Sequence, residues 1–275
     1  MEQQKKIALI NDITGFGRCS IAVELPLISA LKVQACPLPT AILSVHTGFP
    51  TYFIDDYTDR MKDYIASWKK NCLTFDGIST GFMNSLEQID IVIDFIHQFK
   101  QPDTIVIVDP VMGDYGKLYA SYTEKLCAEM RRLMQYADVI TPNLTEACQL
   151  LGIPYPEKGH TDRAYLEDIA GRLAAMGPGQ IVITGLADGD HIDNYIYETG
   201  KEPDIVSVKK IGHDRSGTGD AFAAIVSASV VRGDSLKDAV VRATDFISRT
   251  LVYTEQLGLP TNRGLAFEQF LTELH

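Results

Sequence analysis

Short apolar runs alternate with amphipathic segments along almost the whole chain. A continuous apolar run is typical of a strand buried on both faces, whereas apolar residues spaced three and four apart indicate a helix that packs on one side. Strands are predicted at residues 6–10, 33–38, 41–45, 77–79, 104–109, 138–141 and 180–184. Helices are predicted at residues 20–31, 56–68, 85–96, 123–136, 144–151, 166–175, 218–231, 235–251 and 265–274.

One pair of segments departs from this alternation. Residues 190–198 and 203–210 are strand-like and are joined by a turn that contains Thr199 and Gly200, which predicts an antiparallel pair. No Pro/Ser-rich linker and no internal repeat interrupts the chain. We therefore expect an α/β fold over residues 1–275, a single doubly wound domain with helices on both faces of a mostly parallel sheet.

Composition narrows the class of protein. The 275 residues include 25 Lys and Arg against 36 Asp and Glu, a formal charge of −11, and no dense basic tract. A nucleic-acid partner or an anionic membrane surface is therefore not expected. Residues 1–6 lead into a strand rather than into the apolar core of a signal peptide, and the five cysteines include no C-x-x-C pair, so a cytoplasmic protein is expected.

Two familiar nucleotide-binding motifs are missing. Residues 15–20 (GFGRCS) lack the third glycine of the dinucleotide fingerprint, and no acid closes the second predicted strand. The Gly-Lys pairs at 116–117 and 200–201 are followed by Leu and Glu instead of Ser or Thr, so neither is a Walker A motif. A Rossmann dehydrogenase and a P-loop enzyme are thereby excluded.

Chemistry-bearing residues instead gather where three predicted strands end. Asp109 closes the most apolar strand, Asn143 and Glu146 follow the strand at 138–141, and residues 217–220 (GTGD) open a long apolar helix. The carboxyl ends of parallel strands share one edge of a sheet, so these residues should converge as a magnesium-nucleotide site requires. Taken singly, each segment has a plain alternative, since Thr218 could simply cap a helix and N-x-x-E is a capping box.

Five segments, in this order, resemble the ribokinase-like superfamily and specifically the vitamin B6 kinases. The resemblance spans nearly the whole chain and implies a three-layer α/β/α sandwich without a separate lid domain. It also implies ATP with Mg²⁺, a B6 vitamer as the small-molecule substrate and a homodimer. Whether a monovalent cation binds as well is left open. The segments are residues 43–48 (LSVHTG), 108–114 (VDPVMGD), 116–119 (GKLY), 140–146 (ITPNLTE) and 217–222 (GTGDAF).

The resemblance assigns roles on the nucleotide side of the site. Asp220 is the implied base for the substrate hydroxymethyl group, and Gly217, Thr218 and Gly219 provide amides that stabilise the transferring phosphoryl group. Asp109 and Glu146 match the acids near the metal ion. The implied ATP-binding positions are Asp109, Thr141, Asn143, Glu146, Thr184, Val206, Val208, Gly217 and Gly219. Because the chain is acidic, nearby cations should help to hold ATP, and the candidates by position are Lys117, His213 and Arg215.

On the acceptor side, the resemblance places Asp12, His46, Thr47 and Asp220 beside the substrate, with residues 112–119 over the site. Many B6 kinases carry Ser-His after the first strand, but Asn-Asp stands at residues 11–12 here, which leaves the preferred vitamer open. The predicted function is phosphorylation of the 5′-hydroxymethyl group of pyridoxal, pyridoxine or pyridoxamine. A hydroxymethylpyrimidine kinase of thiamine synthesis and a non-catalytic module that binds pyridoxal phosphate are the alternatives.

Overall fold

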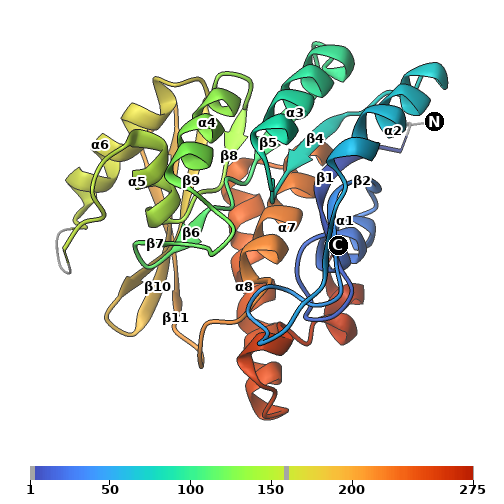
Figure 1. Cartoon of the computed structure of the whole chain (residues 1–275). Coiled ribbons are helices and arrows are strands. Elements are labelled where there is room, and N and C mark those ends of the chain that lie inside the picture. The colour runs from blue at the N-terminus through green and yellow to red at the C-terminus, as the bar shows by residue number, and fades with distance from the viewer. Residues whose placement is uncertain (1–3, 158–160, 275) are drawn as a thin grey trace.

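A nine-stranded sheet runs through the computed structural model, which describes residues 4–157 and 161–274 (Figure 1). Its strand order is β11-β10-β9-β8-β5-β4-β1-β2-β3, and neighbours from β9 to β2 are parallel. The strands are β1 (Lys6–Thr14), β2 (Gln34–Leu43), β3 (Ile54–Asp56), β4 (Gly77–Thr80), β5 (Ile105–Val108), β8 (Val139–Ile140), β9 (Gln180–Asp188), β10 (His191–Glu198) and β11 (Asp204–Lys209). A separate hairpin is made by β6 (Gly113–Asp114) and β7 (Lys117–Leu118).

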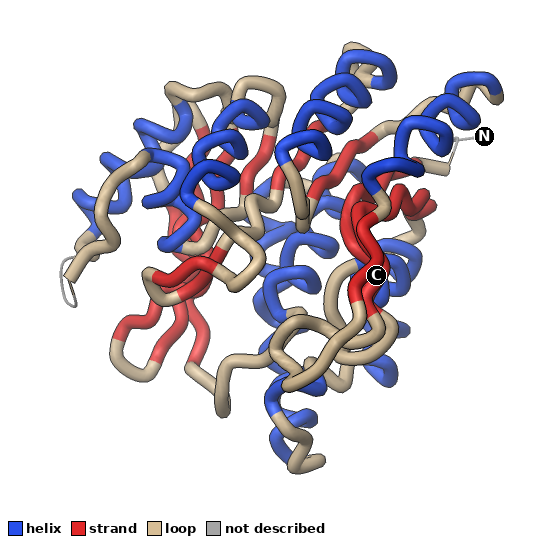
Figure 2. The backbone as a smooth tube through the Cα atoms, in the orientation of Figure 1, coloured by secondary structure: helices blue, strands red, loops and turns tan. Residues whose placement is uncertain are grey.

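Helices flank the strands on both sides, which completes the expected three-layer α/β/α fold (Figure 2). One face carries α2 (Thr58–Lys70), α3 (Leu86–Phe99), α4 (Glu124–Met134), α5 (Leu144–Leu151) and α6 (Arg163–Ala174). The other carries α1 (Ile21–Ala30), α7 (Thr218–Arg232) and α8 (Leu236–Gln256). Within the described part of the chain, no helix is both long and apolar enough to cross a bilayer.

The central strands explain why their sequences are apolar without alternation. In β5, Val106 and Val108 pack into the core beneath α2–α6, while Ile107 points into the core beneath α1, α7 and α8. Both faces are covered, so every position favours a β-branched side chain. The α/β fold predicted from the apolar runs is confirmed.

The structure differs from the prediction in two regions. Residues 34–43 form one strand rather than two, because Pro37 and Pro39 lie where β2 pairs only with β1, before β3 joins it at Ala41. The missing N–H groups of the prolines can therefore face an open edge. Residues 265–274 were expected to be helical, but the 3₁₀ helix η2 (Glu268–Glu273) forms there instead, preceded by a second 3₁₀ helix, η1 (Thr261–Arg263). Residues 265–267 are buried, and the Ala266 amide donates to the Thr254 hydroxyl of α8 at 2.9 Å, so this stretch packs on α8 before η2 begins.

The topology places the ends of the parallel strands beside the N-termini of two helices. The segment after β8 leads directly into α5, and the loop after β11 leads into α7. The predicted antiparallel pair β10–β11 is present and extends the sheet beyond β9. This edge of the sheet therefore brings together the motifs that the sequence analysis singled out.

Candidate active site

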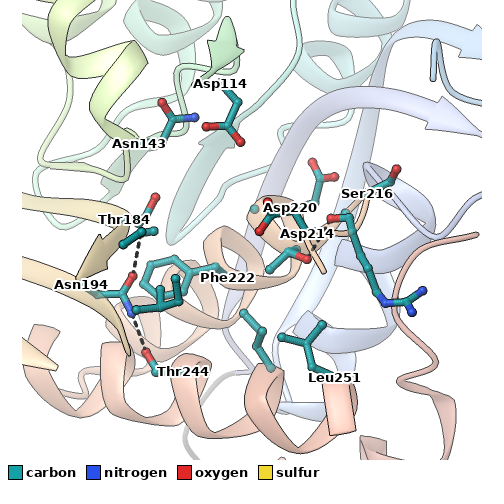
Figure 3. A pocket seen from close by; sticks show the side chains of 18 of the residues that line it. Asp114, Asn143, Thr184, Asn194, Asp214, Ser216, Asp220, Phe222, Thr244 and Leu251 are labelled. Atoms are coloured by element: carbon teal, nitrogen blue, oxygen red, sulfur yellow. Dashed lines mark hydrogen bonds between the residues drawn. The ribbon is translucent and has the colours of Figure 1, made fainter. Parts of the chain in front are cut away.

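A cavity of about 330 Å³ opens at this edge and contains the three motifs together (Figure 3). Such a volume suits a small organic ligand. Asp109 and Thr141 line it from the ends of β5 and β8, Thr184 from β9, and residues 216–220 from the start of α7. The predicted convergence of the strand ends is confirmed.

The glycine turn, residues 217–219, exposes the first amides of α7 to the cavity. Gly217 is the N-cap and adopts a φ of 78°, which glycine accommodates readily. Because glycine has no side chain, nothing on the N-cap residue occupies these amides. Capping by Thr218 was the plain alternative, but the Thr218 hydroxyl instead donates a hydrogen bond of 2.9 Å back to the Arg215 carbonyl. A helix N-terminus with open amides can bind an anion.

Asp220 lies in the first turn of α7 and lines the same cavity. Burial raises its pKa to about 6, and the negative charge of Asp12 acts in the same direction, while hydrogen bonds from the Ser20 amide and the Asn11 side chain oppose them. A helix N-terminus favours the ionised carboxylate, but burial has the larger effect here, because the pKa lies above its usual value. At pH 7 Asp220 is mostly ionised and can still accept a proton.

A second pair of acids is buried more deeply. Asp109 is 8% exposed and accepts a hydrogen bond of 3.0 Å from the Thr141 hydroxyl. Glu146 closes a capping box with Asn143, accepting from the Asn143 amide at 2.8 Å and from the Met112 amide at 3.1 Å. Burial raises the pKa of both carboxyl groups; the charge of Asp220 adds to the effect on Asp109, and that of Asp109 to the effect on Glu146.

The β6–β7 hairpin is bound to the start of α5 and covers one side of the cavity. Asn143 donates to the Gly113 carbonyl at 2.8 Å, and the Gly116 amide donates to the Thr145 hydroxyl at 2.9 Å. At the hairpin tip, the Tyr115 hydroxyl donates to the Asp214 carboxylate on the opposite loop. The hairpin and the loop before the glycine turn are thus joined across the cavity, as expected for residues 112–119.

The wall formed by β10, β11 and α8 is mostly apolar, with one polar network. Val208 lines it with Ile192, Ile247 and Leu251. Asn194 accepts from the Gly185 amide at 3.2 Å and donates to the Thr244 hydroxyl at 3.1 Å (Figure 3). Val206, the other expected contact, is half-buried and packs against the core under α1, α7 and α8 rather than lining the cavity.

The three candidate cations have different positions. Arg215 lines the cavity, but its guanidinium is paired with Glu255. Lys117 is exposed and is not part of the cavity wall, whereas His213 is. Lys209 and Lys210, which sequence reasoning missed, also line the cavity. Their position at the end of a strand beside the glycine motif was the available signal.

Of the residues expected beside the acceptor, Asp220 lines this cavity, whereas Asp12, His46 and Thr47 lie outside it. The Asp12 carboxylate accepts from the hydroxyls of Thr14 and Ser20, both at 2.6 Å. His46 donates from Nε2 to the Asn262 carbonyl at 2.8 Å, and its Nδ1 accepts from the Gly48 amide at 3.1 Å. Thr47 is exposed.

Asn11 and Glu24, which were not among the expected site residues, extend this internal network. Asn11 accepts from the amides of Asp12 and Phe82 and donates to Glu24 at 3.0 Å. Glu24 is 3% exposed in the first turn of α1. A lone glutamate in an apolar helix was the available signal for a special environment.

Comparisons with known proteins agree with this geometry. A family model described as phosphomethylpyrimidine kinase matches residues 21–264. Pyridoxine kinase from Bacillus subtilis is 31% identical over 75% of this chain and 72% of its own length. The bifunctional thiamine biosynthesis protein ThiED from Geobacter sulfurreducens is 25% identical over 92% of this chain, which spans only about half, 51%, of that longer protein.

A solved structure is similar over the whole described fold. It belongs to a Bacteroides thetaiotaomicron protein provisionally assigned as a phosphomethylpyrimidine kinase, in an orthorhombic crystal form with pyridoxal. The two chains superpose with a TM-score of 0.95 and 39% identity, covering 99% of this chain and 96% of the other.

Proposed function

The chain belongs to the phosphomethylpyrimidine kinase family, and we propose that it transfers the γ-phosphoryl group of ATP to the 5′-hydroxymethyl group of a B6 vitamer. One observation carries this proposal: Asp220 and the open amides of the glycine turn share one cavity with the buried acids Asp109 and Glu146. A base, an anion-binding helix N-terminus and a cation-binding pair are the parts that phosphoryl transfer requires.

Asp220 would take the proton of the attacking hydroxyl as the O–P bond forms. An acid whose pKa is about 6 is ionised at neutral pH and suits this task. The amides at the start of α7 would stabilise charge on the transferring group, because the N-cap Gly217 has no side chain to occupy them and the Thr218 amide makes only a long bond of 3.4 Å to the Arg215 carbonyl. The apolar wall that contains Val208 and Leu251 would receive the adenine ring.

The residues present fit a magnesium ion held mainly by ATP. Asp109 and Glu146 offer carboxylate oxygens, and their mutual repulsion would be relieved by a cation. With two protein carboxylates, such an ion would complete its shell with water and phosphate oxygens. When bound, the ion neutralises charge on the phosphates.

Two acceptors remain in competition within this family. The B. subtilis relative is a pyridoxine kinase and the B. thetaiotaomicron structure has a form with pyridoxal, which supports a B6 vitamer as the acceptor. ThiED acts in thiamine biosynthesis, and the family model is that of a phosphomethylpyrimidine kinase, which supports hydroxymethylpyrimidine as the second candidate.

Initial rates of ADP formation test the proposal directly. Purified protein with Mg²⁺ and ATP is given pyridoxal, pyridoxine, pyridoxamine or hydroxymethylpyrimidine, and D220N serves as the blank. We expect turnover with at least one B6 vitamer and a loss of roughly 100- to 10,000-fold in D220N, the range for a general base. Binding of a non-hydrolysable ATP analogue to D220N should change little.

Each other outcome points elsewhere. Turnover with hydroxymethylpyrimidine alone would assign the chain to the second candidate. Full activity in D220N would remove Asp220 from the role of base. Tight binding of a B6 vitamer without ADP formation would overturn the kinase proposal in favour of a binding module.

A further inference from the structure

The C-terminal segment, residues 259–268, contacts the surroundings of the glycine turn from two sides. It lies after α8, far from the turn in sequence, and contains η1 and the first residue of η2. Residues 265–267 are buried in the core under α1, α7 and α8, and the Ala266 amide donates to the Thr254 hydroxyl at 2.9 Å. The segment is therefore firmly attached to α8.

The first contact is made by Arg215, whose side chain is 3% exposed. Its guanidinium donates to the Leu259 and Pro260 carbonyls at 2.9 and 3.2 Å and, through Nε and Nη2, to Glu255 at 3.2 and 2.8 Å. The Arg215 carbonyl in turn accepts from the Thr218 hydroxyl. The side chain thus fixes the loop to α8, and the main chain fixes the glycine turn to the loop.

The second contact is made by Arg18. Its side chain donates to Glu268 at 2.6 Å and to the Arg263 carbonyl at 3.1 Å. Its carbonyl oxygen lies against Gly217, so that a Cβ built on Gly217 would be only 1.9 Å away. The segment therefore holds the backbone that packs directly on the N-cap of α7.

We propose that Arg215 is a positioning residue that sets the amides of the glycine turn by tying their loop to Glu255 and the C-terminal segment. The proposal rests on the proposed function. Lysine cannot replace Arg215, because one ammonium group cannot bond Glu255 and two carbonyls in the same plane. A small displacement of the amides then lowers the rate of phosphoryl transfer more than it weakens nucleotide binding.

The test compares R215K, E255Q and the control R132K in the full chain. Arg132 makes an exposed ion pair with Asp90 on the far helices, so R132K changes the same side chain away from the cavity. We expect R215K to lose roughly 10- to 100-fold in kcat, with the KM for ATP altered about threefold or less. E255Q keeps an acceptor oxygen and should lose less, and R132K should match the unchanged protein.

Amide resonances of Gly217 and Gly219 in ¹⁵N-labelled protein give a readout that does not need turnover. They should move in R215K and stay in place in R132K. If the unchanged protein transfers no phosphoryl group to any acceptor, the proposed function fails, and these resonances alone decide the inference. Unmoved resonances in folded R215K, or an unchanged kcat, would overturn it.

Discussion

The proposed phosphate side and the proposed acceptor side of the site use their polar groups in opposite ways. On the phosphate side, the amides of the glycine turn and the Asp220 carboxylate face a cavity. On the acceptor side, Asp12 and His46 have their polar atoms engaged by neighbouring hydroxyls, an amide and a carbonyl.

This difference distinguishes polar groups that are open to bind a ligand from polar groups that are already bonded and fix the positions of backbone segments. Asp12 fixes Ser20, which has a φ of 54° and whose amide is directed at Asp220. His46, with Nε2 protonated and Nδ1 accepting, joins the loop after β2 to the C-terminal segment. The acceptor side holds backbone segments in place, and we call it the frame. The phosphate side presents polar groups to the cavity, and we call it the receptor side.

Gly217→Ala would break the receptor side most severely. The new Cβ would collide with the Arg18 carbonyl at a φ of 78°, so the turn must move and its amides lose their alignment. We expect a loss of about 100-fold or more in kcat, measured by ADP formation. Gly233 has a φ of 100° and free space around it, so Gly233→Ala controls for backbone strain alone. Equal losses in both variants would contradict the prediction.

The pH dependence of kcat/KM sharpens the role of Asp220. Because burial raises its pKa to about 6, the rate should be constant above that pH and fall tenfold per unit below it. Asp12→Asn removes a charge that raises this pKa, so the fall should begin at a lower pH. Asp63, exposed on α2, provides the control variant D63N. A profile unmoved by D12N would show that Asp12 does not act on the base.

His46→Ala tests the frame on the acceptor side. It removes both bonds of the ring, so the loop after β2 should become more mobile and bind the acceptor less well. We expect the KM for the acceptor to rise about tenfold, or about 1.4 kcal/mol, which lies within the net range for the two lost hydrogen bonds, with the KM for ATP unchanged. H97A, on the exposed side of α3, is the control. A matching rise in the KM for ATP would contradict a separate acceptor side.

Glu24→Gln should have the smallest effect, and it concerns stability. Burial raises the pKa of Glu24 well above its usual value, so the stability it contributes is present at low pH and lost as pH rises through that raised pKa. Glutamine can still accept from Asn11 and needs no ionisation. Thermal melts should show E24Q above the unchanged protein by roughly 2–4 °C at pH 8 and by less at pH 5. A lower Tm at pH 8 would refute this.

Local sequence patterns predicted most of the fold, because a strand that is covered on both faces has a continuous run of apolar residues. The strand β5 and the glycine turn before α7 were found this way. The continuity of β2 was missed because prolines argue against a strand unless its pairing partners are known.

The positions of single side chains were harder to predict, since their partners are distant in sequence. Arg215 was a candidate for the ATP phosphates, but Glu255 and the 259–260 carbonyls, about forty residues later, take its guanidinium. His46 bonds a carbonyl 216 residues away. No spacing rule within a motif carries that information.

The hydrogen bond between Tyr115 and Asp214 has a kinetic consequence. It connects the hairpin tip to the loop before α7 across the mouth of the cavity. If the chain transfers phosphoryl groups as proposed, a nucleotide in the cavity would leave past this bond, and ADP release would then depend on how often the two side chains separate. The slowest step of turnover would then be the separation of one phenol and one carboxylate at the surface, rather than the phosphoryl transfer in the cavity beneath them.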